Sequence, residues 1–388
     1  MDCFDYLQNN SLSRADLSDE YGEVLNVHYG DILVKFGEVI DLTRESLPTI
    51  ADDSILIKYT NSILQDGDVV IADAAEDETV GKCSEIKGCE GKKVLAGLHT
   101  IPVRPRVKYA NGFLGYFMNS AAYHNQLLPL MQGTKVSSIS KTAIQDTVLN
   151  IPYVIEEQKR IADYFMGLDR LITLHQRKCE QTKKLKKYML QKMFPQNGEL
   201  YPEIRFEGFT EAWEQRKLSD YLEVSKEKNK EETFGKEDVL SVSGEFGIVN
   251  QIEFQGRSFA GASVANYGVV EVGDVVYTKS PLKSNPYGII KTNQGKSGIV
   301  STLYAVYKAR NNVNPEFVQI YFELDSRMNS YMHPLVNKGA KNDMKVSDEN
   351  ALKGPVIFPE IEEQKLISQY FASLDTLITL HQRKPYDL

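Results

Sequence analysis

The sequence predicts an α+β protein with two globular domains in tandem, separated and joined by long antiparallel coiled-coil helices. The segment "IEEQKRIADYFMGLDRLITLHQRK" at 155–178 recurs as "IEEQKLISQYFASLDTLITLHQRK" at 361–384, with 18 of 24 positions identical at an offset of 206. The same offset relates Gly67-Asp68-Val69-Val70 to Gly273-Asp274-Val275-Val276. A repeat period near 200 residues indicates a duplicated domain rather than a solenoid. The repeated segment also has apolar residues at spacings of three and four, the period of a coiled-coil seam.

The bulk composition is that of a globular protein. The chain has 388 residues, 42% of them hydrophobic, which favours about two domains. We expect no membrane span, because no run of 18 apolar residues exists, and no secretory signal, because "MDCFDYLQNN" has no apolar core. The four cysteines form no CxxC pair, so we expect free thiols in a reducing cytoplasm.

Both halves have the same order of segments. A Gly-Asp turn leads into a β-branched strand, then a basic glycine-rich segment, an apolar strand (94–103 and 298–307), an amphipathic helix, a Gly-Lys loop and the repeat. In the second half Asn314 can cap a helix and Pro315 suits its first turn, and we expect Val318, Phe322 and Asp325 to share one face of that helix. The predicted parts are a first domain at 1–150, a spacer helix at 151–195, a linker and second domain at 196–355, and a short second spacer helix at 356–388.

The repeat predicts a long helix from about 156 to 193, roughly 57 Å at 1.5 Å per residue. Its seam residues are Ile161, Phe165, Leu168, Ile172 and His175, matched by Ile367, Phe371, Leu374, Ile378 and His381. A lone helix with one apolar seam is unstable in water, so we expect the two copies to pair. The alternatives are a spacer with no further role and a seam that forms a homodimer.

Net charge is −8, yet two tracts contain no acid. Residues 91–145 hold seven Lys and Arg, and residues 275–310 hold six. These tracts predict two anion-facing surfaces; the alternative is chance clustering on solvated faces.

The combination of these segments resembles the specificity subunit of type I restriction-modification systems. The resemblance rests on the repeated "IEEQK…LITLHQRK" helix and on "IRFEGFTEAWEQRKL" at 204–218, in family order over nearly the whole chain. It implies two target recognition domains that each read half of a bipartite, asymmetric site in double-stranded DNA. The helices would set the unread spacer and dock two adenine methyltransferase subunits, and restriction subunits would join the larger complex. The resemblance implies no catalysis and no cofactor on this chain; S-adenosylmethionine, ATP and Mg would belong to partner subunits.

Two departures from the family pattern are visible. The first domain has no counterpart of "FEGFTEAWEQRKL", and the last helix has no counterpart of "CEQTKKLKKYMLQKMF" at 179–194. They indicate a natural short variant or a recombined allele, and leave open an inactive or regulatory subunit that still binds methyltransferase.

The candidate DNA-binding residues are donors and acceptors in the basic tracts and Gly-Lys loops, since base edges and phosphates need such groups. In the first domain they are Lys92, Lys93, Arg104, Arg106, Lys135, Ser137, Ser138 and Lys141. In the second domain they are Lys279, Ser280, Lys283, Ser284, Asn285, Lys291, Asn293, Gln294, Lys296 and Lys341. For each of them a solvated surface side chain is the alternative interpretation.

Catalytic motifs are not convincing. "SNPYG" lacks the second proline of the Asn-Pro-Pro-Tyr methyltransferase loop, and Ile290 stands where a P-loop before "GKS" needs glycine. Cys83 and Cys89 have no nearby histidine partners for zinc. Two other classes remain: an interaction protein with two heads on a coiled-coil spacer, which would lack salt-dependent DNA affinity, and a self-sufficient DNA enzyme, which would turn over unaided.

Overall fold

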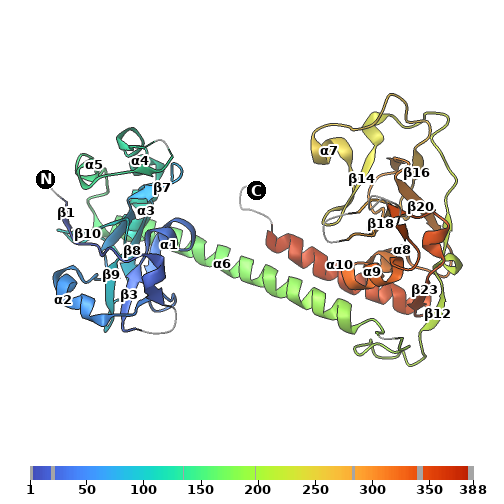
Figure 1. Ribbon diagram of the computed structural model, residues 1–388, viewed down its shortest axis with the longest axis horizontal. Coiled ribbons are helices and arrows are strands. Elements are labelled where there is room, and N and C mark those ends of the chain that lie inside the picture. The colour runs from blue at the N-terminus through green and yellow to red at the C-terminus, as the bar shows by residue number, and fades with distance from the viewer. Residues whose placement is uncertain are drawn as a thin grey trace. The chain divides into compact units, whose positions relative to one another are not determined.

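The computed structural model describes residues 3–18, 22–133, 135–196, 198–281, 285–338 and 344–382. The chain divides into two compact units, Met1–Thr173 and Leu174–Leu388, called unit 1 and unit 2 below. Each unit combines sheets with helices, which confirms the tandem α+β fold (Figure 1). Helix α6 (Ile155–Lys192) begins in unit 1 and ends in unit 2, within one residue of the predicted helix at both ends.

Unit 1 is built on a five-stranded sheet in the order β1-β10-β6-β8-β4 and a four-stranded sheet in the order β2-β5-β3-β9. The strands of the first sheet are β1 Phe4–Tyr6, β10 Thr100–Pro105, β6 Val69–Ala72, β8 Cys83–Lys87 and β4 Val39–Asp41. Those of the second are β2 Leu17–Ser18, β5 Thr49–Ile50, β3 Val24–Val27 and β9 Lys93–Ala96. A short pair, β7 Ala74–Ala75 and β11 Ser137–Ser138, lies beside them, and the helices are α1 Tyr29–Val34, α2 Leu56–Tyr59, α3 Phe113–Asn119, α4 Ala121–His124 and α5 Lys141–Gln145.

Strand β6 is buried on both faces. Val69 and Ile71 belong to one apolar cluster, while Val70 and Ala72 belong to another. Successive side chains of a strand point to opposite faces, so an unbroken apolar run is what such a central strand requires.

The main sheet of unit 2 has the order β13-β20-β17-β18, which repeats the order β1-β10-β6-β8 of unit 1. Its strands are β13 Leu222–Val224, β20 Tyr304–Ala309, β17 Val275–Thr278 and β18 Ile290–Thr292. Smaller pairs are β14 Leu240–Ser243 with β15 Gly247–Asn250, β16 Gly268–Val270 with β19 Gly298–Val300, β12 Glu214–Lys217 with β23 Pro355–Phe358, and β21 Asn337–Lys338 with β22 Met344–Lys345. The helices are α7 Gln251–Gln255, α8 Pro315–Tyr321, α9 Asp325–Met332, α10 Ile361–Gln382 and the second part of α6.

The Gly-Asp turn before β6 and β17 is the same structure twice. Gly67 and Gly273 have φ of +90° and +91°, a conformation that favours glycine. The carboxylate of Asp68 accepts from the backbone N–H of Gln65 at 2.8 Å. The carboxylate of Asp274 accepts from the N–H of Glu271 at the same distance, 2.8 Å. The repeat in the sequence therefore corresponds to a duplicated fold.

The prediction that Val318, Phe322 and Asp325 share a face of one helix is wrong, because two helices form here. Asn314 caps α8 as expected, accepting from the N–H of Phe317 at 2.8 Å, but α8 ends at Tyr321 and α9 begins at Asp325. The buried guanidinium of Arg327 donates to the carbonyls of Tyr321 and Leu190, at 2.7 and 2.9 Å. The break allows one side chain to satisfy the end of α8 and to join it to α6.

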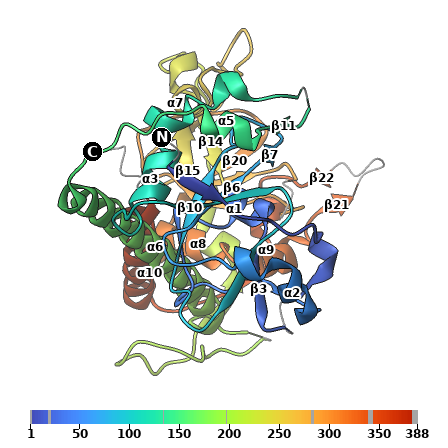
Figure 2. The ribbon, with the colours of Figure 1, turned by 90° about the vertical axis from the view of Figure 1, so that its left-hand side faces the viewer.

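Within unit 2, α10 and the second part of α6 run antiparallel (Figures 1 and 2). Nδ1 of His175 lies 3.0 Å from Nδ1 of His381, and Lys186 forms an ion pair with Asp375 at 2.6 Å. Just beyond the end of α6, the ring of Phe194 lies 6.2 Å from that of Phe371. In these contacts the residue numbers rise along α6 and beyond its end while they fall along α10, as expected for an antiparallel pair.

Candidate nucleic-acid interface

Most predicted cations of unit 1 already have partners within the chain. Arg104 donates twice to the carboxylate of Asp68, at 2.9 and 2.7 Å, and that carboxylate is almost fully buried. Arg106 pairs with Asp5 at 2.8 Å and Lys93 with Glu23 at 3.0 Å. The ammonium group of Lys92 donates to the carbonyl of Leu42. The acids that neutralise these side chains come from strands and loops far away in the sequence.

The remaining candidates of unit 1 surround β11 and the start of α5. Ser137 and Ser138 form β11, which pairs with β7. Lys135 and Lys141 flank it with exposed side chains, and neither forms an ion pair or hydrogen bond within the described part of unit 1. Lys141 starts α5, whose N-cap Ser140 accepts from the N–H of Ala143 at 3.1 Å. These two lysines are therefore free to meet an anion.

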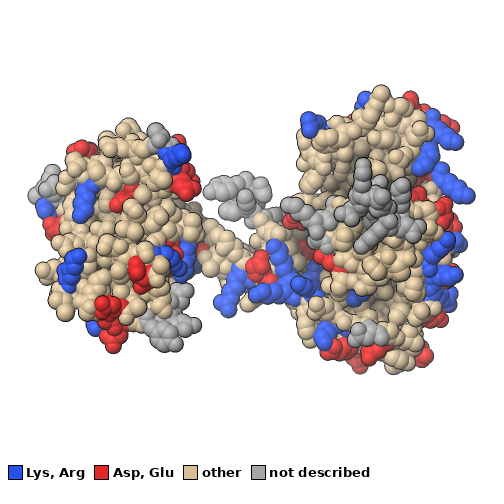
Figure 3. Space-filling model, viewed as in Figure 1, with Lys and Arg blue, Asp and Glu red and all other residues tan. Residues whose placement is uncertain are grey.

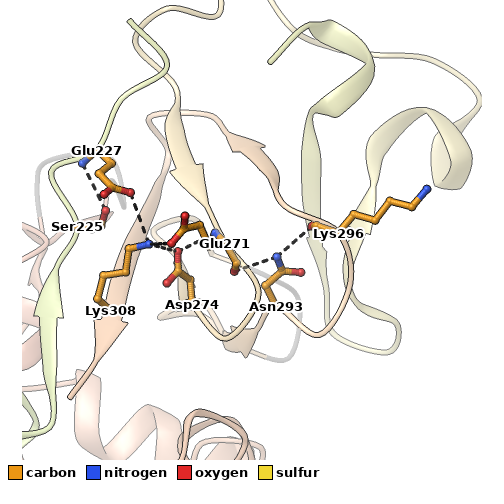
Figure 4. A network of polar contacts seen from close by, with 7 residues as sticks. All are labelled: Ser225, Glu227, Glu271, Asp274, Asn293, Lys296 and Lys308. Carbon is orange, nitrogen blue, oxygen red and sulfur yellow. Dashed lines mark hydrogen bonds and ion pairs between the residues drawn. The ribbon is translucent and has the colours of Figure 1, made fainter. Parts of the chain in front are cut away.

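The tract of unit 2 contains buried and exposed candidates. Asn285 and Lys291 are both buried, and burial lowers the pKa of Lys291. Asn293 is buried too, and its amide donates to the carbonyls of Glu271 and Lys296, at 3.1 Å each (Figure 4). Lys279 pairs with Asp348 at 2.8 Å.

Three candidates remain more accessible and three cannot be placed. Ser280 is half-buried, while Gln294 and Lys296 are exposed. In Figure 4 the Lys296 side chain points away from the polar network. The candidates Lys283, Ser284 and Lys341 lie outside the described residues.

Lys308 shows why an acid-free tract in the sequence is not an acid-free surface. Its ammonium group contacts Glu271 at 2.6 Å, Asp274 at 3.0 Å and Glu227 at 3.5 Å (Figure 4). The hydrogen bond from Lys308 lowers the pKa of Glu271, whereas burial raises the pKa of Asp274. Antiparallel pairing brings all three carboxylates to a strand that has none of its own.

One strongly basic surface was missed by the sequence analysis. The second part of α6, 174–192, carries seven Lys and Arg and one acid, Glu180. Lys and Arg gather along these helices in Figure 3. Lys186 is held between Glu323 and Asp375, while Lys183 and Lys187 are exposed. The clustering of lysines was visible in the sequence, but it lay in the segment interpreted as a spacer that pairs with the second helix and docks partner subunits.

A cleft of about 1020 Å³ in unit 2 brings several of these groups together. Its walls include Lys183 and Lys187 from α6, Lys291 and Gln294 from the predicted tract, and Phe246 from the turn between β14 and β15. Phe246 is 60% exposed. The cleft is also lined by four carboxylates, Glu245, Glu323, Asp325 and Asp375. Its cations, amide and accessible aromatic ring are groups that bind phosphates, base edges and base faces.

The helix candidates fall into two groups. Ile367, Phe371 and Leu374 are buried in the core of unit 2, and His381 meets His175. The carbonyl of Ile378 lies 4.0 Å from the sulfur of Cys179. Ile161 packs against the core of unit 1, whereas Phe165, Leu168 and Ile172 are exposed. Their role in pairing or subunit docking stays a prediction.

Within the described ranges, no group of three or more His, Cys, Asp and Glu could hold a metal ion. Those ranges also contain no helix long and apolar enough to cross a membrane.

Comparison with known proteins shows which proteins the chain is similar to. Residues 20–184 match the family described as type I restriction modification DNA specificity domain. The chain is 24% identical over 372 residues to the putative type I restriction enzyme MjaX specificity subunit of Methanocaldococcus jannaschii, covering 91% of this chain and 79% of that protein. It is 26% identical over 160 residues to the type I restriction enzyme MjaVIII specificity subunit of the same organism, which is 40% of this chain and 36% of the relative.

A solved structure shares the fold. It is the type I restriction-modification system S subunit from M. genitalium. The superposition covers 98% of this chain and 88% of that protein, with a TM-score of 0.52 and 12% sequence identity. Over residues 20–184 the chain thus matches the DNA specificity domain of type I restriction-modification systems, and over most of its length it is similar to a specificity subunit of such a system. Its role is recognition of DNA sequence, and subunits of this family are not catalytic.

Proposed function

We propose that each unit reads one half of a bipartite, asymmetric DNA site. The duplicated fold supports this most directly, because β6 and β17 follow the same turn and occupy the same place in the same strand order. The side chains differ at matched positions: Ser84 pairs with Val70 in unit 1, where Lys291 pairs with Val276 in unit 2. Ser84 and Lys291 are themselves buried, so the two half-sites would be read by the accessible groups that these two copies of one scaffold hold.

The DNA-facing groups we propose are the accessible ones. In unit 1 they are Lys135 and Lys141, and in unit 2 Lys183, Lys187 and Gln294 around the cleft. Lysines that neutralise phosphates release counterions, so affinity falls steeply with salt. Replacing Lys183 and Lys187 by Gln is expected to lower the salt slope by about one for each phosphate that is no longer neutralised.

The antiparallel helices of unit 2 also support docking of adenine methyltransferase subunits, and through them restriction subunits. Apolar side chains remain exposed on this helix pair, at Leu185 and Tyr188 of α6 and at Leu377 and Leu380 of α10. Accessible apolar side chains on a paired helix favour further helices as partners. Because the target is DNA, we expect the assembly to act in the cytoplasm.

The test is a map of methylated adenines. The chain is expressed with its cognate methyltransferase in a host free of adenine methylation, and a bipartite motif with a fixed spacer is the expected result. Replacing residues 1–150 by those of another family member should change one half of the motif only. A stable complex without methylation would indicate an inactive or regulatory subunit, and a motif without two halves would contradict the proposal.

A further inference from the structure

Unit 1 has an apolar pocket between α3 and the first part of α6. Its volume is about 380 Å³. Phe113, Tyr116 and Phe117 of α3 line it together with Ile161 and Phe165 of α6. The carboxylates Glu38 and Asp169 also line the pocket. Phe165 is 42% exposed, although it belongs to the predicted seam.

The equivalent place in unit 2 can be found because the repeat docks identically in both units. Gln158 of α6 accepts from the N–H of Ala110 just before α3, at 3.1 Å. Its counterpart Gln364 of α10 accepts from the N–H of Asn314 just before α8, at 2.9 Å. Helix α8 therefore has the same position beside α10 that α3 has beside α6.

In unit 2 this place is filled by Phe194, which follows the end of α6. The ring of Phe194 lies 5.8 Å from Phe317 and 5.9 Å from Tyr321, both on α8. On α10 it faces Phe371, the counterpart of Phe165. Phe194 is 1% exposed, so it closes the pocket completely.

The charged groups around the filled place have counterparts in unit 1. Lys186 pairs with Asp375. The counterpart Asp169 has no lysine partner in the described part of unit 1 and accepts a hydrogen bond from the hydroxyl of Tyr116. Arg205 donates twice to the buried carboxylate of Glu363, at 2.8 Å each, and the counterpart of Glu363 is Glu157. Glu157 is exposed and has no ion pair within the described residues.

An aromatic contact of unit 2 also has an exposed counterpart in unit 1. The ring of Tyr370 lies 6.1 Å from that of Phe206, and its counterpart Tyr164 is 65% exposed. The face of unit 1 thus repeats the apolar, acidic and aromatic groups that residues 186–206 cover on unit 2.

We propose that this face of unit 1 binds a basic amphipathic helix followed by an extended segment, with the chemistry of residues 186–206, supplied by a separate polypeptide. In the bound segment a lysine would pair with Asp169, a phenylalanine would fill the pocket and an arginine would pair with Glu157. A second copy of this chain is not the source, because its own Phe194 and Arg205 are held in its unit 2. The partner of this proposal is another chain that contains such a helix.

The test uses the full chain and a fluorescent peptide of residues 183–208. Saturable one-to-one binding is expected, and binding should weaken at least about tenfold when Phe194→Glu is made in the peptide. Phe165→Glu in the chain should weaken it similarly, since this exposed side chain lines the pocket. Val34→Glu, at an exposed apolar position on α1, is the matched control and should leave binding unchanged.

A charge exchange tests the register of the bound segment. Glu157→Arg in the chain should weaken the unchanged peptide about tenfold, and Arg205→Glu in the peptide should restore binding to that variant. Circular dichroism would verify that each chain variant is folded.

Three results would overturn the proposal. They are the absence of saturable binding, failure of the exchanged pair to recover, and a dimer of the chain in sedimentation that Phe165→Glu abolishes. The last would identify a second copy as the occupant.

Discussion

The two copies of the repeated helix have nearly the same sequence and opposite exposure. Phe165 and Leu168 on α6 are 42% and 38% exposed, whereas Phe371 and Leu374 on α10 are 0% and 6% exposed. Both copies dock through the same glutamine. The difference is the neighbour: α10 is covered by the end of α6, by Arg205 and by Phe206, and no described segment of unit 1 takes that place. A coiled-coil seam therefore specifies what a helix can bury, and the rest of the fold decides what it does bury.

The largest effect should come from truncating the buried member of the pair. Phe371→Ala is expected to destabilise unit 2 by about 4 kcal/mol, because a large aromatic side chain leaves a cavity in a packed core. Phe165→Ala should cost less than about 1 kcal/mol. Urea unfolding followed by fluorescence of Trp213, the only tryptophan and a buried neighbour of Phe194, reports unit 2. Hydrogen exchange at β6 and β8 reports unit 1 for the Phe165→Ala variant. Equal losses in the two variants would contradict the comparison.

The next contrast is between the ion pair of Arg205 and Glu363 in unit 2 and the exposed Glu157 in unit 1. Arg205→Ala should destabilise unit 2 by about 3 kcal/mol, since it leaves the carboxylate of Glu363 buried without its partner. Glu157→Gln, at the exposed counterpart in unit 1, should change stability by no more than about 0.5 kcal/mol. Thermal unfolding of both variants at neutral pH checks this, and a large effect of Glu157→Gln would show that unit 1 covers this residue itself.

A third contrast depends on pH. Glu85 in β8 accepts from the N–H groups of Gly112 and Gly115 at the start of α3, and burial raises its pKa to about 7. Since this pKa lies above the ordinary value of 4.5, the folded state holds the proton more tightly. The stabilisation is full below about pH 4.5 and is lost as pH rises through 7, up to about 3 kcal/mol.

The corresponding residue of unit 2 is Thr292, which donates to the carbonyl of Pro315 and has no charge to lose. Glu85→Gln should therefore flatten the pH dependence of unit 1 between pH 4.5 and 7, while the Trp213 transition of unit 2 is unchanged. Hydrogen exchange at β6 and β8 measures unit 1 separately. A slope that survives in Glu85→Gln would assign it to another group.

The smallest effect concerns the histidines at matched positions, which meet in unit 2. His381→Ala removes the hydrogen bond to His175 on an exposed stretch of the helix pair, so we expect a loss of about 0.5 kcal/mol. Urea unfolding with Trp213 fluorescence is again the measurement. A loss above about 2 kcal/mol would make this contact a principal stabiliser of the pair.

The fold was largely predictable because its signals are local or periodic. The Gly-Asp turns, the cap at Asn314 and α6 depend on residues within a few positions of one another. The helix break before α9 was not predictable, because it depends on Arg327 reaching a carbonyl of α6. The candidate site was less predictable for the same reason. Arg104 and Lys308 meet carboxylates that only strand pairing brings to them.

The sequence by itself determined the duplication, the α+β class and the two long helices, since these follow from repeated patterns along one chain. Only the tertiary structure decided which cations are neutralised, which face of each repeated helix is covered and where lysines, Gln294 and Phe246 converge. The physical reason is that burial and charge pairing depend on distances in space. Residues far apart in the chain set those distances, and a linear pattern does not contain them.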